Sequence, residues 1–244
     1  ISNLPVFQPL KLPPDVLADI FSGKIKKWSD PRIISQNREQ YLPDTNITVV
    51  HRSEGSGTTF IFTDYLSKVD PTWFDEVGKG RKIRWPVGMG VEGNGGVAAM
   101  VKAVPGSIGY VQLNYAKEHS LPTALLENRS GNYIEATIAS VAKAADIAIP
   151  PDSRVMITDT DAAEGYPISA FTWIIVYGNQ DYRNFTREHA TALARFLWWA
   201  VHEGQRFNAP LFYAPLPENA VTVAESIIRT MTYDNEQILN LHGE

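Results

Sequence analysis

The sequence contains no cysteine, and this absence excludes disulfides, thiolate metal sites and cysteine nucleophiles. The missing thiols suit an oxidising, extracytoplasmic compartment, although many cytosolic proteins lack cysteine too. No run approaches the roughly 20 apolar residues of a membrane-spanning helix. Residues 1–5 show neither an initiating methionine nor the basic and then apolar pattern of a signal peptide, so we expect a processed or trimmed chain.

Positive charge is also scarce. Among 244 residues, 22 Lys and Arg stand against 27 Asp and Glu, which gives a net charge of −5. Broad binding to nucleic acid or to an anionic membrane needs a basic face, so we expect neither partner. A small anion remains compatible, because a local pocket can be positive on an acidic protein. The content of 44% hydrophobic and 20% charged residues is that of a globular chain.

Helical and strand patterns alternate along the chain, which is typical of an α/β fold. The β-branched run at 47–50 predicts a strand, and the apolar spacing from Phe62 to Val69 predicts a helix soon after it. The run from Phe171 to Tyr177 is the strongest strand pattern in the chain. Further helices are predicted near 14–22, after the glycine-rich turn at 93–96, at 138–145, after Thr186 and at 221–231.

The segment between the strand at 47–50 and the helix after it has the components of an anion site. The first turn of a helix leaves N–H groups without intrahelical partners, and the helix dipole adds partial positive charge there. Gly55 and Gly57 allow a ligand to approach the backbone closely. Ser56 and Thr58 add hydroxyl groups, and the fork of Arg52 can bind two oxygens of a phosphate.

The same segment has a simpler interpretation, in which Ser56 only caps the helix and Arg52 pairs with Glu54 on the surface. The combination of the arginine with two glycines favours the anion site over this alternative. The segment lacks the Gly-Lys-Ser/Thr ending of a nucleotide P-loop, so nucleotide chemistry is not implied. The spacing around Ser56 also misses the Gly-x-Ser-x-Gly frame of a serine hydrolase by one residue.

Five stretches make the resemblance to a known family specific: 23–28, 51–62, 82–88, 93–99 and 105–111. Together they resemble the periplasmic phosphate-binding proteins of ABC transporters, and the similarity is dense from about 10 to 116. The resemblance implies a two-lobed, type II binding-protein fold of the α/β class, whose cleft closes on inorganic phosphate. It implies Arg52, Ser56, Gly57 and Thr58 as phosphate ligands on the second lobe.

The resemblance also gives Glu54 a supporting role, because the best-known members have an aspartate there that pairs with the arginine and tempers its charge. It interprets the turn at 93–96 as a second helix start that is structural rather than ligand-binding. Family members begin with a strand, a turn and a helix that supply the first lobe's ligands, including a carboxylate that accepts the phosphate proton. We expect this chain to start after them, so that the first lobe is incomplete at its N-terminus.

The resemblance further predicts how the chain divides. Residues 8–155 form the second lobe with the anion site, while 1–7 and 156–244 form the crossover and the C-terminal part of the first lobe. The polar stretch at 152–165 marks the expected boundary. Without its usual neighbours, the strand predicted from Phe171 to Tyr177 is expected to expose an unpaired apolar edge, which another copy or an N-terminal fragment could complete.

Metal and cofactor sites are not expected. The five histidines, at 51, 119, 189, 202 and 242, show no ligand spacing, and the loop with Asp159 and Asp161 lacks the glycine of a calcium loop. His51 adjoins Arg52 and is a candidate for the cleft mouth. Lys24, Lys26 and Lys27 are interpreted as a solvated face.

The sequence therefore predicts an extracytoplasmic receptor that delivers phosphate to the transmembrane subunits of an ABC permease and that is not an enzyme. Two alternatives remain open. The first is an oxyanion-sensing domain of a signalling protein on the same fold, which a kinase or transmembrane segment in the full gene product would indicate. The second is an enzyme that acts on a phosphate ester, which lacks support from any general base or metal cluster.

Overall fold

The computed structural model describes residues 1–239 and divides the chain into two compact units. Residues 1–144 and 157–170 form the first unit, and residues 145–156 together with the chain from 171 onward form the second. No helix within residues 1–239 is long and apolar enough to cross a membrane. The first unit carries the candidate site and is described first.

A three-stranded parallel sheet in the order β3-β2-β4 is formed in the first unit. β2 (Thr48–Arg52) is flanked by β3 (Met89–Val91) and β4 (Ser107–Gly109). Alternate residues of β2 point to opposite faces of the sheet, as in any strand. Val49 packs into the main core, which includes Phe62, Tyr65 and Leu66 of α3 (Gly57–Val69), while Val50 packs against Val97 and Val101 of α5 (Gly93–Ala103).

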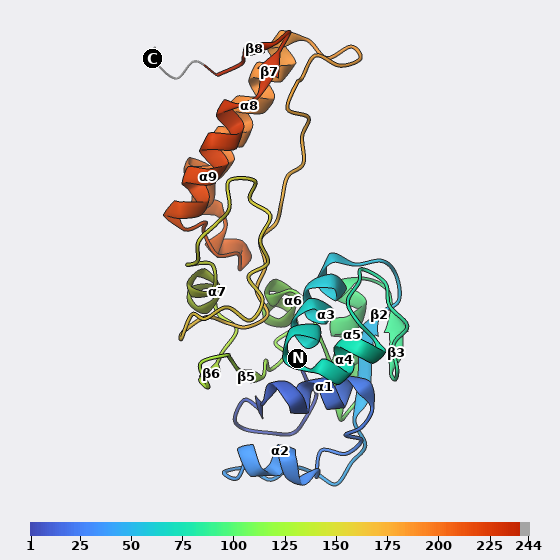
Figure 1. The fold of residues 1–244 in the computed structure, drawn as a ribbon. Coiled ribbons are helices and arrows are strands. Elements are labelled where there is room, and N and C mark those ends of the chain that lie inside the picture. The colour runs from blue at the N-terminus through green and yellow to red at the C-terminus, as the bar shows by residue number, and fades with distance from the viewer. Residues whose placement is uncertain (240–244) are drawn as a thin grey trace. The chain divides into compact units, whose positions relative to one another are not determined.

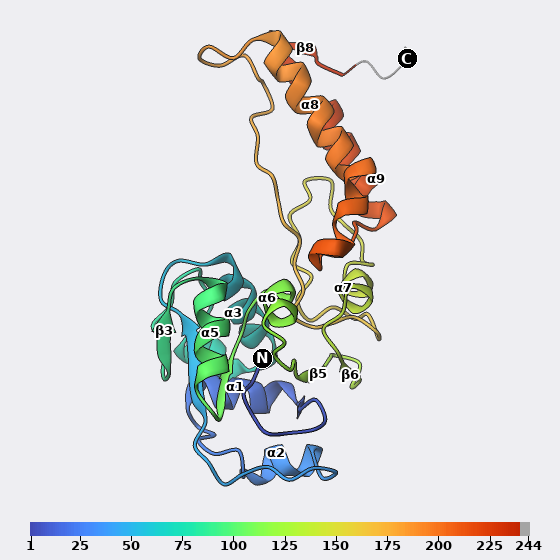
Figure 2. The ribbon, with the colours of Figure 1, turned by 180° about the vertical axis from the view of Figure 1, so that it is seen from behind.

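The two helices therefore cover opposite faces of this sheet, with α3 towards the viewer in Figure 1 and α5 in Figure 2. A second sheet joins β1 (Lys11–Leu12), β5 (Leu125–Glu127) and β6 (Tyr133–Ile134) in that order. Around these sheets lie α1 (Pro14–Ser22), α2 (Pro31–Gln36), α4 (Pro71–Glu76), α6 (Leu113–Glu118) and α7 (Ile138–Ala144).

The main core is rich in aromatic side chains, among which Trp28, Trp73, Tyr65 and Phe21 are fully buried. Trp28 satisfies its only side-chain donor inside the core, because Nε1 donates to the Gly106 carbonyl at 2.9 Å. The predicted end of the first helix at Gly23 is confirmed. Gly23 adopts the left-handed conformation, with φ of 79°, that glycine reaches without strain.

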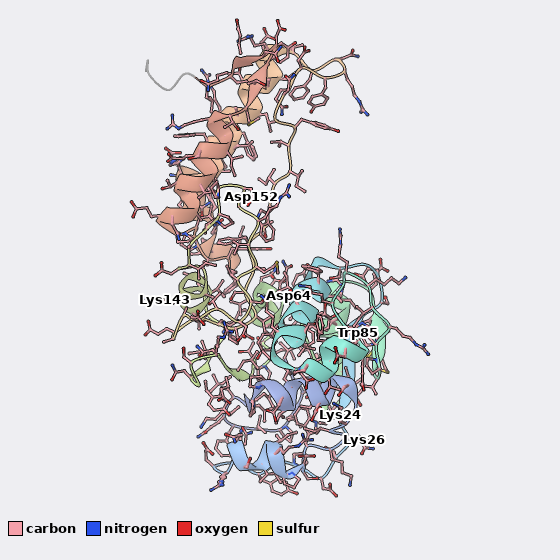
Figure 3. The ribbon with its side chains drawn as sticks, viewed as in Figure 1. Lys24, Lys26, Asp64, Trp85, Lys143 and Asp152 are labelled. Atoms are coloured by element: carbon pink, nitrogen blue, oxygen red, sulfur yellow. The ribbon has the colours of Figure 1, made fainter. Side chains whose placement is uncertain are left out.

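A buried carboxylate fastens residues 157–170 to α3 (Figure 3). Asp64 is fully buried, and its oxygens accept hydrogen bonds from the Thr158 hydroxyl at 2.5 Å and from Lys79 Nζ at 2.6 Å. Lys68 Nζ lies 3.1 Å from the same carboxylate and also donates to the Thr158 carbonyl. The two lysines balance a charge that would otherwise be costly to bury.

The second unit consists mainly of two packed helices and the segments that connect them. Its long helices are α8 (Arg187–Val201) and α9 (Glu218–Arg229), which pack through Ala194, Leu197, Ile228 and Met231. Thr186 caps α8 as predicted, since its hydroxyl accepts from the His189 backbone N–H at 3.4 Å. Two short 3-10 turns, η1 (Glu203–Phe207) and η2 (Ala209–Leu211), and the strands β7 (Thr232–Tyr233) and β8 (Glu236–Gln237) complete the described part.

The strand predicted from Phe171 to Tyr177 is wrong as secondary structure. This segment forms no strand in the described residues, and its apolar side chains are open to solvent, with Ile175 92% and Tyr177 68% exposed. A β-branched run needs a neighbouring strand to form a ladder, and the described chain places none beside it. The apolar side chains are exposed, but without a strand the predicted unpaired strand edge is not present in the described residues.

The structure differs from the predicted division of the chain at two segments. Residues 1–7 belong to the first unit, because Asn3 N donates to Ser107 O and Gly109 N donates to Ile1 O, both at 2.9 Å. Residues 157–170 also pack there, through the Asp64 contacts. The predicted lobe of 8–155 and the remainder at 1–7 and 156–244 therefore do not coincide with the compact units, and the correspondence between units and lobes stays a prediction.

Candidate anion-binding site

The candidate site begins where β2 leads into α3. Ser56 is extended, with φ of −133° and ψ of 136°, and is the N-cap of this 13-residue helix. Its hydroxyl oxygen accepts from the Thr59 backbone N–H at 3.3 Å, so the predicted cap is present. The hydroxyl hydrogen of Ser56 remains free to donate to another acceptor.

Two N–H groups of the first turn remain without an acceptor. Within residues 1–239, the backbone N–H groups of Gly57 and Thr58 donate to no protein atom. The space in front of this turn is open, because a Cβ built at Gly55 or Gly57 would meet nothing within 4 Å. Unpaired donors at the positive end of a helix favour an anion.

Arg52 is the last residue of β2 and forms an ion pair with Glu54. The arginine side chain is only 12% exposed, and its Nε donates to Glu54 Oε1 at 2.6 Å while Nη2 contacts the same oxygen. Gly93 N also donates to this oxygen at 3.2 Å. The hydrogen bond from Arg52 lowers the pKa of Glu54 to about 2, so the carboxylate is ionised at neutral pH. The pairing implied by the resemblance is therefore present.

Tyr110 and Thr59 connect the end of β2 to the start of α3. Arg52 N donates to the Tyr110 hydroxyl at 3.2 Å, and this hydroxyl lies 2.6 Å from Thr59 Oγ1. Burial raises the pKa of Tyr110, which therefore stays protonated. Neither Tyr110 nor Thr59 was predicted from the sequence as part of the site. Their link to Arg52 depends on the β2–β4 register, in which Val50 lies opposite Gly109.

A surface cavity of about 300 Å³ adjoins this strand end. Of the predicted residues, Arg52 and Glu54 line it together with Thr59, whereas Ser56, Gly57 and Thr58 do not. The other lining residues are His51, Ser53, Lys82, Ile83, Trp85 and Gly90. The structure thus places the predicted ligands in two adjacent groups, one on the cavity wall and one at the helix start.

One wall of the cavity is aromatic. His51 stacks on Trp85, with ring centroids 4.7 Å apart, and its Nδ1 lies 3.1 Å from the Arg52 carbonyl (Trp85 is labelled in Figure 3). Burial lowers the pKa of His51, so its ring is neutral at pH 7. His51 thus lines the cavity beside Arg52, and its place at the mouth of a cleft stays a prediction.

The second glycine-rich helix start, at α5, is already occupied by protein. Gly93 N donates to Glu54, and Asn94 Nδ2 donates to Gln112 Oε1 at 3.0 Å. This arrangement supports its structural interpretation, since the turn holds the carboxylate that pairs with Arg52.

Other candidates from the sequence lie away from the site. No group of three or more metal-ligating side chains is found within residues 1–239, and His242 lies outside the described residues. Lys24, Lys26 and Lys27 are exposed, as expected of a solvated face (Figure 3 labels the first two).

Comparison with known families identifies relatives of this chain. A family model described as "PBP superfamily domain" matches residues 1–202. The chain is 41% identical to "Phosphate-binding protein PstS" of Xylella fastidiosa (strain 9a5c), with 93% of this chain and 62% of the relative covered. It is 38% identical to the protein of the same name from Haemophilus influenzae, with 94% and 69% covered. It spans about three fifths of the length of the first curated relatives.

Solved structures show the same fold at low identity. A human phosphate binding apolipoprotein matches with a TM-score of 0.67 at 19% identity, over 89% of this chain and 66% of the other. A phosphate binding protein from Stenotrophomonas maltophilia matches with a TM-score of 0.62 at 17% identity, over 93% and 65%. These likenesses confirm the predicted α/β binding-protein fold class.

Proposed function

Because the chain belongs to the PBP superfamily and, within it, to the PstS phosphate-binding proteins, we propose that it captures inorganic phosphate for delivery to an ABC permease. The single observation that carries the proposal is the open first turn of α3. There the N–H groups of Gly57 and Thr58 have no acceptor in the described chain, and Arg52 ends the preceding strand. These groups suit a tetrahedral oxyanion.

Each proposed ligand has a distinct role. Gly57 and Thr58 offer fixed backbone donors, which lose no side-chain entropy on binding. Ser56 can donate its hydroxyl hydrogen while its oxygen continues to cap the helix. Arg52 adds a planar guanidinium that can bind two oxygens, and Glu54 holds this group in position through Oε1.

This set covers one side of the anion. We propose that further polypeptide, either another copy or an N-terminal fragment of the same protein, covers the other side. With these residues alone, solvent screens the charges, so we expect weak, salt-sensitive binding with little preference for phosphate over sulfate.

Calorimetric titration of the purified chain with phosphate, and with sulfate as the matched control, tests the proposal. We expect one weak site whose affinity falls as salt is added. Absence of heat with both oxyanions at high ligand concentration would remove the proposed function. Sub-micromolar phosphate binding with rejection of sulfate by a monomer, shown by size-exclusion chromatography and intact mass, would retain the function but contradict the need for further polypeptide.

We also propose that the chain is an extracytoplasmic receptor and not an enzyme. Its relatives are named as binding proteins, and the proposed contacts are N–H and O–H donors that hold an anion without a reaction step. His51 on the cavity wall is buried and neutral, and it faces the Arg52 carbonyl. Release of product from a generic phosphomonoester, above the rate of an Arg52→Ala control, would refute this part of the proposal.

A further inference from the structure

The charges on the cavity wall do not cancel. Arg52 and Glu54 form a pair of zero net charge, and His51 is neutral because burial disfavours its protonated form. The remaining charged lining residue is Lys82. No ion pair of Lys82 occurs within the described chain. The net positive charge of the cavity wall therefore resides on this lysine.

The backbone places Lys82 next to the start of α3 as well. Ser56 N donates to the Arg81 carbonyl at 2.7 Å, so the residue before Lys82 is bonded to the helix cap. Lys79, at the beginning of the same loop, is held by its contact with the buried Asp64. The loop is thus fixed at two points, and Lys82 lines the cavity one residue after the bond to the helix cap.

Other cations on the loop differ from Lys82 in position. Arg84 is exposed and has no ion pair in the described residues, but it does not line the cavity. Its charge, size and loop are comparable, so it provides a matched control for long-range attraction. A comparison of Lys82 with Arg84 therefore separates direct contact with the anion from long-range electrostatic attraction by the loop.

We infer that Lys82 is a further ligand-contacting residue of the proposed oxyanion site, and that it supplies the uncompensated charge which a dianionic tetrahedral ligand requires. This inference rests on the proposed capture of phosphate. The flexible four-carbon stem would let the ammonium group adjust its position to the anion. Such a contact adds charge without the fixed two-oxygen geometry that Arg52 provides.

The test compares phosphate titrations of the full chain and of the variants Lys82→Gln, Lys82→Arg and Arg84→Gln. We expect Lys82→Gln to raise the Kd by roughly 3- to 5-fold, as for loss of one exposed charge beside the anion. Lys82→Arg should retain most of the affinity, and Arg84→Gln should change it less than about twofold. The dependence of Kd on salt should become less steep in Lys82→Gln.

The outcomes separate this inference from the proposed function. If the unmodified chain binds neither phosphate nor sulfate, the proposed function fails. If it binds phosphate and Lys82→Gln binds equally well, the function stands and the role of Lys82 is overturned. If Arg84→Gln loses as much affinity as Lys82→Gln, the loop acts through its field and the direct contact is refuted. Thermal unfolding of each variant confirms that the compared chains are folded.

Discussion

Replacement of Arg52 by alanine removes the guanidinium and also isolates a carboxylate. In the intact chain, Glu54 Oε1 accepts from Arg52 and from Gly93 N, while Oε2 is buried with no partner in the described residues. Arg52→Ala leaves Glu54 with only the Gly93 contact and lowers the charge of the cavity wall by one. Loss of a charge-assisted, two-oxygen contact costs roughly 2–5 kcal/mol, or about 30- to 5000-fold in Kd.

The double variant Arg52→Ala/Glu54→Gln tests the electrostatic part of this prediction. It removes both charges, so the net charge of the wall returns to the value in the unmodified chain. We expect it to bind phosphate roughly 3- to 10-fold more tightly than Arg52→Ala, because the unpaired carboxylate no longer repels the anion. Both variants should remain folded, since Arg52 lies at the end of β2 rather than in the core.

Calorimetry gives the affinities, and acid unfolding gives a second measurement. Arg52 is the main cause of the depressed Glu54 pKa. The pair therefore adds stability above the unfolded-state pKa of about 4.3, and this contribution is lost as pH falls towards about 2. Arg52→Ala should lack this acid-sensitive contribution. A phosphate isotherm of Arg52→Ala that matches the unmodified chain would refute the assignment of Arg52.

Three further predictions concern the helix start, the buried carboxylate and the second unit. Gly57→Pro removes one backbone donor at the first helical position, where proline is tolerated after the extended Ser56. Phosphate binding should therefore weaken by roughly 1.5–3 kcal/mol, with little change in melting temperature, and unchanged affinity would contradict the backbone contact. Asp64→Asn should lower the free energy of unfolding by roughly 1–3 kcal/mol in denaturant titrations, because two lysines lose their buried partner. A variant of equal stability would refute the stabilising role of this carboxylate. The contacts of His202 with the Trp198 carbonyl and Glu225 raise its pKa. The protonated ring therefore adds to the free energy of unfolding below about pH 6.5, and this contribution is lost as pH rises through the folded-state pKa. His202→Gln should abolish this pH dependence of stability, and a dependence that persists in the variant would exclude His202 as its source.

Local chemistry made much of the fold predictable from the sequence. The helix that begins at Gly57, its Ser56 cap and the left-handed end of α1 at Gly23 all follow from residue preferences within a few positions. The strand expected from Phe171 to Tyr177 did not form, because a strand depends on a partner that lies elsewhere in the chain or outside it. Propensity alone carries no information about that partner.

The part of the candidate site that depends on neighbours along the chain was also predictable from the sequence. The sequence placed Arg52 next to the helix start and paired it with Glu54, which are neighbours along the chain. Tyr110 is 58 positions from Arg52, and only the register of β2 and β4 brings them together. Lys82 was not predicted as a site residue, because its place on the cavity wall depends on long-range packing, including the backbone bond between Ser56 and Arg81.

The Asp64–Thr158 hydrogen bond has a consequence for how the chain folds during synthesis. These partners are 94 residues apart, and the chain enters the second unit between 144 and 157 before it returns. At ribosomal rates of about 5–20 residues per second, α3 emerges roughly 5–20 s before Thr158 can reach it. During that interval the nascent first unit lacks its last segment, and the Asp64 carboxylate has its ion pairs with Lys68 and Lys79 but lacks the hydrogen bond from Thr158. Completion of the first unit, which carries the candidate site, therefore waits for residues 157–170, which are translated after residues 145–156 of the second unit.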